Sequence, residues 1–208
     1  MAGHSMTSLW TRSDPLLLAS ASPTRRLLLD GAGLTVEACA ADVDERGLEA
    51  AGHDGPAALA LVLARAKARA VAQRFPGRLV VGADQVLSCD GAFLHKPADL
   101  AQAREQIAML SGRTHSLHAA VAIAEGGEVV DGFVEEARLT LRRLDAEQIA
   151  RYVALAGPAR VTASVGGYQL EGLGIHLFER IEGDHSTILG LPLLPLLKRL
   201  RERGCLAF

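Results

Sequence analysis

The sequence predicts an α/β protein in which a mixed sheet is flanked by helices. Segments with apolar residues at helical spacing alternate with short segments rich in leucine and valine, which favours a layered sheet with helices. Two later segments alternate polar and apolar residues and follow each other closely, which indicates an antiparallel pair in the same sheet. With 208 residues, of which 49% are hydrophobic, the chain is long enough to bury a core as one domain or as two closely packed lobes.

Proline and glycine mark the first elements. We expect residues 1–14 to form a disordered N-terminal extension and residues 15–208 to form a single domain. A buried strand is predicted over residues 15–19. Ser22 and Pro23 then supply a helix cap and a proline in the first turn, and two glycines end a short helix.

The middle of the chain predicts a long helix and a strand interrupted by a turn. Residues 35–41 are expected to be extended, and Pro56 begins an Ala/Leu/Arg-rich helix that ends before Pro76. The run "RLVVGADQVLS" predicts a strand that enters a turn at Gly-Ala-Asp and then continues. Residues 89–92 predict a hairpin.

The second half of the chain completes the sheet. A helix over about residues 99–110 is followed by two strands, 115–124 and 128–141, that we expect to pair as a long antiparallel ribbon. Asp145 caps a further helix. The stretch "GGYQLEGLGIHLFERIEG" predicts a turn, a strand and a turn, and residues 193–201 predict a closing helix.

The overall charge and the cysteines narrow the class of protein. A net charge of −2 and a pI near 6.4 exclude a general nucleic-acid surface, because nonspecific binding depends on neutralising many phosphates. Three widely spaced cysteines form neither a disulfide framework nor a zinc site, which indicates a reduced compartment. No apolar run reaches the roughly 18 residues that a membrane span needs, so we expect a soluble cytoplasmic protein with no membrane partner.

The stretch "LASASPTRRLLLDGAGL", residues 18–34, contains a candidate anion site. Arg25 falls in the first turn of the predicted helix, where the partial positive charge of the helix end disfavours a cation. Ser20, Ser22 and the free N–H groups of that turn are suited to bind a phosphate, and Arg25 would extend such a site. The alternative is an ordinary Ser-Pro helix cap, since the glycine-rich P-loop pattern is missing.

Acidic residues form a second candidate site. Asp84 follows buried strand residues in "VVGADQV", and open α/β sheets commonly place ligands at strand ends. Asp42, Asp44 and Glu45 form a short acidic cluster, which together with Asp84 offers hard oxygen ligands to Mg²⁺. The alternatives are a turn aspartate and a solvated loop.

Lysine is rare, with only Lys67, Lys96 and Lys198 among 22 basic residues. Lys67 and Lys96 are candidates for a compact, mobile positive charge, with a solvated surface lysine as the alternative for both. The histidines and serines show neither HExxH nor GxSxG spacing, so we expect no catalytic histidine and no serine nucleophile.

Eight stretches together resemble the Maf-like nucleoside triphosphate pyrophosphatases in order and spacing: "LASASPTRRLLLDGAGL", "VDE", "ARAKA", "VVGADQV", "HKP", "LSGRTH", "EGLG" and "GLPL". The resemblance runs from about Leu16 to Leu200. It implies an α/β fold of the inosine-triphosphatase-like type with a cleft between two lobes, usually as a homodimer. It also implies cleavage of a nucleoside triphosphate to the monophosphate and pyrophosphate with a divalent metal cation, Mg²⁺ or Mn²⁺.

The resemblance assigns roles position by position. Asp84 resembles the family's general base, which takes a proton from a metal-bound water that attacks the α-phosphorus. Glu45 resembles the acidic residue of the metal site, which Asp84 shares. The implied phosphate-binding set is Ser20, Arg25, Lys67 and Lys96.

Three further positions bear on the choice of base. Where the branch acting on dTTP and UTP has GADT and IQG, this chain has Gln85 and Glu171, which is more similar to the 7-methyl-GTP branch. A carboxylate at Glu171 would accept two hydrogen bonds from a guanine edge and favour the positive charge that N7 methylation adds. Thr24 departs from both branches, which carry arginine or a bulky residue there, so stacking on the base has no support at that position.

Two other functions remain open at this point. The first is a dTTP/UTP pyrophosphatase of the same family, which differs in the base pocket. The second is a nucleotide-binding regulator of cell division with little turnover, which would use the same anion site.

Overall fold

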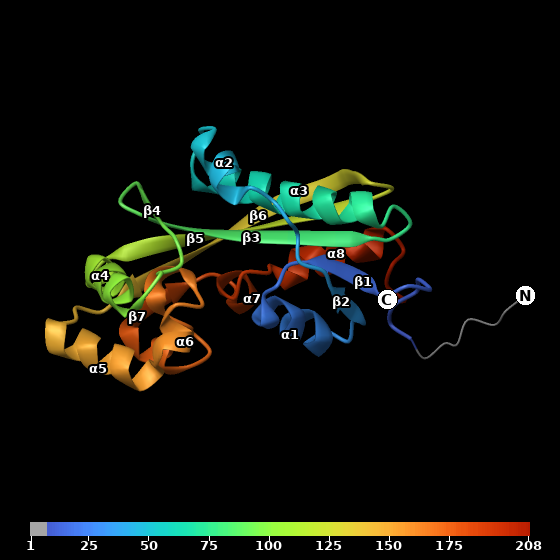
Figure 1. Cartoon of the computed structure of the whole chain (residues 1–208). Helices are drawn as coiled ribbons and strands as arrows, with labels where there is room; N and C mark the ends of the chain where they lie inside the picture. Colours follow the sequence, from blue (N-terminus) through green and yellow to red (C-terminus); the bar gives the residue numbers. More distant parts are fainter. Residues whose placement is uncertain (1–7) are drawn as a thin grey trace, which may run out of the picture.

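The computed structural model describes residues 8–208 and is built on a seven-stranded sheet in the order β2-β1-β3-β5-β6-β7, with β4 paired to β3 outside this path (Figure 1). The strands are β1 (Leu16–Ala19), β2 (Val36–Ala38), β3 (Val80–Cys89), β4 (Ala92–Leu94), β5 (Thr114–Glu125), β6 (Glu128–Leu141) and β7 (Phe178–Glu182). The helices are α1 (Pro23–Gly31), α2 (Glu45–Ala50), α3 (Pro56–Arg74), α4 (Leu100–Leu110), α5 (Ala146–Ala156), α6 (Pro158–Val161), α7 (His185–Ile188) and α8 (Leu193–Glu202), with 3₁₀ turns η1 (Val165–Gly167) and η2 (Leu173–Leu177).

The sheet is mixed, as the sequence predicts. β1 pairs in parallel with both β2 and β3. β5 runs antiparallel to β3 and to β6, and β6 runs antiparallel to β7. The predicted mixed α/β sheet with flanking helices is therefore confirmed.

Helices cover both faces of the sheet. Successive side chains of β1 point to opposite faces, so this strand contributes to the core on each side. α3 lies on one face, where its residues pack in a core with Leu17 and Ala19, while α1 and α8 lie on the opposite face in a core with Leu16 and Leu18 (Figure 1). A third core joins α4 and α5 to the far ends of β3, β5 and β6. The molecule thus has two lobes, one around β1 and the other around α4 and α5.

Local capping explains why most predicted helices are present. The hydroxyl of Ser22 accepts a hydrogen bond from the backbone N–H of Arg25 at 3.3 Å, which fixes the start of α1. Asp99 caps α4 in the same way, and Asp145 forms a reciprocal capping box with Gln148 at the start of α5. The predicted long antiparallel ribbon is confirmed as β5 and β6.

The turn predicted at Gly-Ala-Asp is wrong, because β3 continues through it without interruption. β5 pairs with β3 from Val80 to Ser88 and so keeps Asp84 inside the ladder, opposite Ala120. Gly82 is required for a different reason: a Cβ there would overlap the Ala64 carbonyl oxygen of α3. The glycine lets a helix approach the sheet closely, and no turn is formed.

Other differences concern short elements. α2 and α7 follow the N-cap residues Asp44 and Asp184, and neither helix is predicted from the sequence. The stretch before β7 forms the 3₁₀ turns η1 and η2, and only Phe178–Glu182 is a strand.

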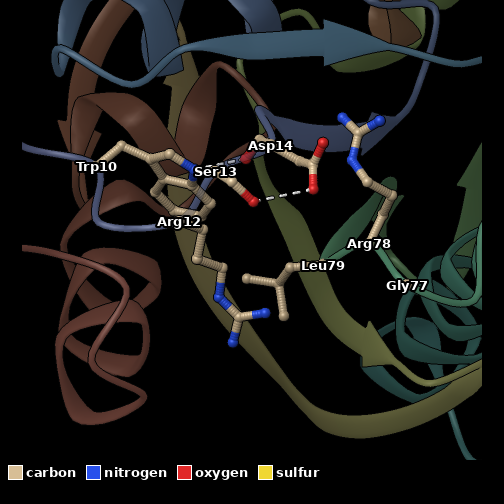
Figure 2. Close-up of a pocket in the computed structure, with 7 residues that line it drawn as sticks. All are labelled: Trp10, Arg12, Ser13, Asp14, Gly77, Arg78 and Leu79. Atoms are coloured by element: carbon tan, nitrogen blue, oxygen red, sulfur yellow. Dashed lines mark hydrogen bonds between the residues drawn. The ribbon is translucent and has the colours of Figure 1, made fainter. Parts of the chain in front are cut away.

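The residues before β1 are attached to the domain. We call residues 8–14 the N-terminal strap; the first seven residues of the predicted extension lie outside the described residues. Trp10 is buried, and its bridge to Leu206 joins the strap to the C-terminal segment. The strap and the loop before β3 surround a small cavity of about 250 Å³ beside Arg12 and Arg78 (Figure 2). For residues 8–14 the structure therefore differs from the expected disordered extension, because apolar burial of one tryptophan holds them in place.

Across residues 8–208, no helix is both long enough and apolar enough to cross a membrane.

Candidate active site

A gap along one edge of β3 creates the site. β1 pairs with β3 as far as Ala19 opposite Gly82, and β4 pairs with β3 from Leu87 onward. Between these two strands lies a cavity of about 1170 Å³, lined by residues of both lobes, which agrees with the expected cleft. The nine residues considered under the family resemblance all line this cavity: Ser20, Thr24, Arg25, Glu45, Lys67, Asp84, Gln85, Lys96 and Glu171. Asp42 and Asp44, the other members of the acidic cluster, do not line it.

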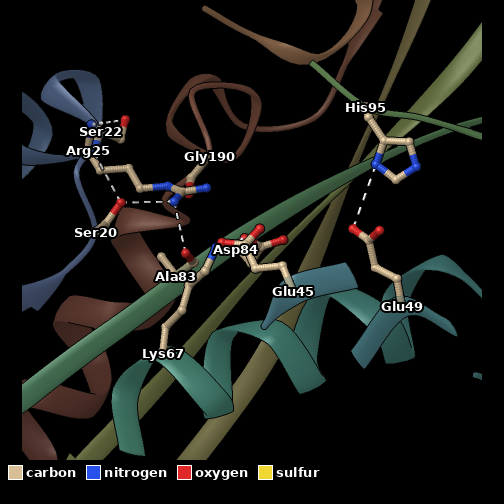
Figure 3. Close-up of polar contacts among 10 residues, drawn as sticks. All are labelled: Ser20, Ser22, Arg25, Glu45, Glu49, Lys67, Ala83, Asp84, His95 and Gly190. Atoms are coloured by element: carbon tan, nitrogen blue, oxygen red, sulfur yellow. Dashed lines mark hydrogen bonds and ion pairs between the residues drawn. The ribbon is translucent and has the colours of Figure 1, made fainter. Parts of the chain in front are cut away.

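Lys67 joins two carboxylates at the centre of the cavity (Figure 3). Its Nζ donates to Asp84 Oδ1 at 2.5 Å and lies 2.9 Å from Glu45 Oε1. The side chains of Lys67 and Asp84 are only 12% and 11% exposed, whereas that of Glu45 is 49% exposed. Lys67 therefore compensates a carboxylate that is largely removed from water, while Glu45 remains accessible to a ligand.

Three elements position this group. Lys67 extends from α3, Asp84 from the middle of β3, and Glu45 from the first turn of α2. The close approach of α3 at Gly82 brings Lys67 within reach of Asp84.

The two carboxylates fit a divalent cation that a phosphate ligand would also coordinate. Within the part of the chain that the structure describes, no cluster of three or more His, Cys, Asp or Glu side chains is suited to hold a metal. Asp84 and Glu45 offer two hard oxygen donors, and Mg²⁺ typically binds through one or two carboxylates together with substrate phosphates. The residues present match that mode of binding and do not form a closed protein cage.

Arg25 anchors the loop between α7 and α8. Its Nη1 donates to the Ala83 carbonyl at 2.8 Å and to Ser20 Oγ at 3.1 Å, and its Nε donates to the Gly190 carbonyl at 2.8 Å. Desolvation lowers the pKa of Arg25 from its usual value, although the negative charges of Asp84 and Glu45 act to raise it.

Ser20 and Ser22 have different local roles. Ser20 is buried, and its hydroxyl accepts hydrogen bonds from the backbone N–H of Ser22 and from Arg25. Ser22 caps α1, so the ordinary Ser-Pro cap considered from the sequence is present. The capping bond also occupies the Arg25 N–H, so this N–H of the first turn is not free to bind a phosphate.

Gln85 points away from Asp84 to the opposite face of the sheet, because neighbouring residues of a strand alternate. Its Nε2 donates to the carbonyls of Thr187 and Ile188 at 3.1 and 3.0 Å. These carbonyls belong to the last turn of α7, and that of Thr187 also accepts the backbone N–H of Gly190 at 3.0 Å. Gln85 thus ties α7 to the strand that carries Asp84.

Thr24 and Glu171 meet although 147 positions separate them in the chain. Thr24 Oγ1 lies 3.5 Å from Glu171 Oε1, at the limit of a hydrogen bond. Glu171 is exposed in the loop between η1 and η2. The two residues form one end of the cavity, and the carboxylate there is accessible to a ligand.

Other residues of the cavity were not predicted from the sequence. Arg46 and Glu49 extend from α2, and Phe93 and His95 come from β4 and the loop that follows it. His95 Nδ1 lies 3.7 Å from Glu49 Oε1 (Figure 3). No spacing in the sequence marks these residues, because α2 and the loop after β4 are far apart in the chain and come into contact only in the fold. The only signal in the sequence that could have found them is that Arg46 directly follows Glu45 and His95 directly precedes Lys96.

The fold and this cavity define an α/β protein with an acidic and basic cleft suited to a phosphorylated ligand. The chain belongs to the family described as Maf-like protein, whose model matches residues 15–203.

Several relatives are similar over almost their full length. A protein of Rhodopseudomonas palustris (strain BisB18) named nucleoside triphosphate pyrophosphatase is 52% identical, over 97% of this chain and 100% of its own. A protein of Rhizobium johnstonii named 7-methyl-GTP pyrophosphatase is 54% identical, over 92% of this chain and 97% of its own. Among solved structures, a HAM1 protein from Coxiella burnetii is similar with a TM-score of 0.45 at 16% identity, over 91% of this chain and 97% of that one.

Proposed function

We propose that the protein is a metal-dependent nucleoside triphosphate pyrophosphatase that releases the monophosphate and pyrophosphate. The convergence of Asp84, Lys67 and Glu45 in a cavity large enough for a nucleotide carries this proposal. The names of the relatives from Rhodopseudomonas palustris and Rhizobium johnstonii support it.

Asp84 is the proposed general base. Lys67 binds its Oδ1, which orients the carboxylate so that Oδ2 is directed to accept a proton from the attacking water. A bound Mg²⁺ or Mn²⁺ would be held by Asp84 and Glu45 and would supply Lewis-acid polarisation of the phosphate and of the water. Proton transfer to Asp84 leaves the protonated carboxyl beside Lys67, which remains paired with Glu45.

The cations of the cavity offset the charge of the substrate. Arg25 is fixed by two backbone carbonyls and Ser20, so its orientation is determined before a ligand binds. Lys96 is exposed in the loop after β4 and lines the same cavity. Preorganised positive groups stabilise the charge that develops on a departing pyrophosphate, which is the main source of acceleration in phosphoryl transfer.

For the base, we propose 7-methyl-GTP as the preferred substrate. The exposed carboxylate of Glu171 is available to accept two hydrogen bonds from a guanine edge, whereas uracil and thymine offer one such donor. Thr24 lies beside Glu171 and is too small to stack on a purine. The name of the Rhizobium johnstonii relative supports this choice.

A nucleotide panel tests the proposal. With Mg²⁺ or Mn²⁺, we expect pyrophosphate release from 7-methyl-GTP at a higher kcat/KM than from GTP, UTP or dTTP. Asp84→Asn should reduce kcat by about 10²–10⁴-fold, because the general base is lost. Asp90→Asn is the matched control, since Asp90 lies in the β3–β4 turn, pairs with Arg113 and does not line the cavity.

The same panel separates the alternatives. If Glu171→Gln leaves the preference for 7-methyl-GTP over UTP unchanged, our account of the base is wrong; Glu179→Gln on β7 is the control. Release from UTP and dTTP alone would favour the pyrimidine branch. Nucleotide binding without turnover would favour the regulator. Homodimerisation and a cytoplasmic location stay predictions, the first of which sedimentation can test.

A further inference from the structure

The basic residues of the cavity fall into two groups. Its four lysine and arginine side chains are Arg25, Arg46, Lys67 and Lys96. Arg25 and Lys67 are already bonded to carbonyls or carboxylates. Arg46 and Lys96 are exposed and have neither a hydrogen bond nor an ion pair with any side chain in residues 8–208. Two positive charges in the cavity therefore remain available to a ligand.

One contact joins the two elements that carry these charges. Arg46 lies three residues before Glu49 on α2, so both point to similar sides of the helix. Glu49 contacts His95 at 3.7 Å, and His95 is adjacent to Lys96. The backbone carbonyl of His95 accepts a hydrogen bond from Gln106 of α4 at 3.0 Å, which fixes the loop.

The order of groups along the cavity indicates what these charges bind. In Figure 3, Arg25 and Ser20 lie on one side of Asp84, and Glu49 and His95 lie on the other. Thr24 and Glu171, the proposed base contacts, adjoin the side of Arg25. A nucleotide with its base at Glu171 and its α-phosphorus at Asp84 would extend its β- and γ-phosphates toward α2 and the loop after β4.

We propose that Arg46 binds the pyrophosphate part of the substrate, and pairs across the cavity with Lys96 to form a two-cation clamp. This inference rests on the proposed function and adds a residue that the family resemblance does not assign. Arg46 presents a planar fork that matches phosphate oxygens in a bidentate manner, while Lys96 supplies a mobile point charge. The Glu49–His95 contact at 3.7 Å links α2, which carries Arg46, to the loop that carries Lys96.

Calorimetric titration with inorganic pyrophosphate in the presence of Mg²⁺ tests the clamp directly. We expect Arg46→Gln to weaken pyrophosphate binding about tenfold, because a charge-assisted contact is lost. Arg46→Lys should restore part of the affinity. Arg104→Gln is the control, since Arg104 is exposed on α4, outside the cavity. Binding of the nucleoside monophosphate should be the same in all four proteins.

The outcomes distinguish a failure of the clamp from a failure of the proposed function. If Arg46→Gln binds pyrophosphate as tightly as the original protein, or loses affinity for the monophosphate equally, the clamp is excluded. If pyrophosphate binding falls but no triphosphate is hydrolysed by the unmodified protein, the clamp stands and the proposed function fails. Normal hydrolysis with unchanged pyrophosphate affinity rejects the clamp and leaves the proposed function intact.

Discussion

Arg25 occupies a position that the charge of its own helix disfavours, and its surroundings account for this. α1 has no acidic residue in its first turn, so the helix end supplies no compensation. The compensation comes from the carbonyls of Ala83 and Gly190 and from the field of Asp84 and Glu45. Gly190 has a φ of +87°, and a Cβ there would lie 3.3 Å from Arg25 Nε. The conformation and the size of this glycine are thus both required for the arginine to bind the loop.

Burial determines the charge state of His115. Its side chain is buried, Nε2 lies 2.6 Å from the Tyr168 hydroxyl, and Nδ1 has no hydrogen-bond partner in the described chain. Desolvation lowers the pKa of His115 from 6.5 to about 4. Below pH 6.5 the unfolded chain therefore binds a proton that the folded protein does not bind, so the stability present above pH 6.5 is lost as the pH falls toward 4.

We expect this histidine to reduce the free energy of unfolding by about 2 kcal/mol between pH 7 and pH 5. Urea unfolding at both pH values measures the loss, and His115→Gln, which cannot titrate, should show a pH dependence smaller by this amount. An identical pH dependence in the two proteins would show that folding does not lower the pKa of His115.

At the scale of elements, the contact between α3 and β3 controls the site. A Cβ on Gly82 would overlap the Ala64 carbonyl oxygen and lie 2.6 Å from Ala68 N, so α3 would have to move. We expect Gly82→Ala to reduce the free energy of unfolding by about 1–3 kcal/mol and to lower kcat by displacing Lys67 from Asp84. Gly77→Ala is the control, because a Cβ there would have no neighbour within 4 Å. Equal stability and activity in both variants would contradict this account.

Elements with their own local signals were predictable from the sequence. α1, α3, α4 and α5 each begin with a proline or a capping aspartate and continue for at least two turns. α2 and α7 are six and four residues long, too short for apolar spacing to show. Gly82 was misinterpreted because a glycine that admits a helix and a glycine that makes a turn are identical in sequence.

In the molecule as a whole, local sequence patterns do not encode contacts between distant segments, and this explains which parts of the site could be predicted. The nine predicted residues line one cavity, and most were assigned through the family resemblance, which carries spatial information that spacing alone lacks. Arg46 and His95 belong to no such motif. Glu49 and His95 meet only through the arrangement of the two lobes, and local patterns in the chain do not encode that contact.

The N-terminal strap contributes to the stability of the molecule but does not line the cavity. It precedes β1, whereas the cavity opens beyond the other end of that strand. Trp10, the single tryptophan, is 7% exposed, and its Nε1 donates to the Asp14 carbonyl at 2.7 Å. Backbone hydrogen bonds from Thr11 N to the Cys205 carbonyl and from Ala207 N to the Leu9 carbonyl join both ends of the chain.

We expect Trp10→Ala to reduce the free energy of unfolding by about 3–5 kcal/mol, because a large buried side chain is removed and the resulting cavity is only partly filled. KM and kcat for the triphosphate should be unchanged at temperatures where the variant remains folded, since no part of the strap lines the site. Urea unfolding followed by circular dichroism measures the first effect, and steady-state kinetics measure the second. Trp10→Phe is the matched control and should lose less stability. A rise in KM without a loss of stability would mean instead that the strap acts on the cavity through β1, and the two ends of that strand would then have to be treated as one functional unit.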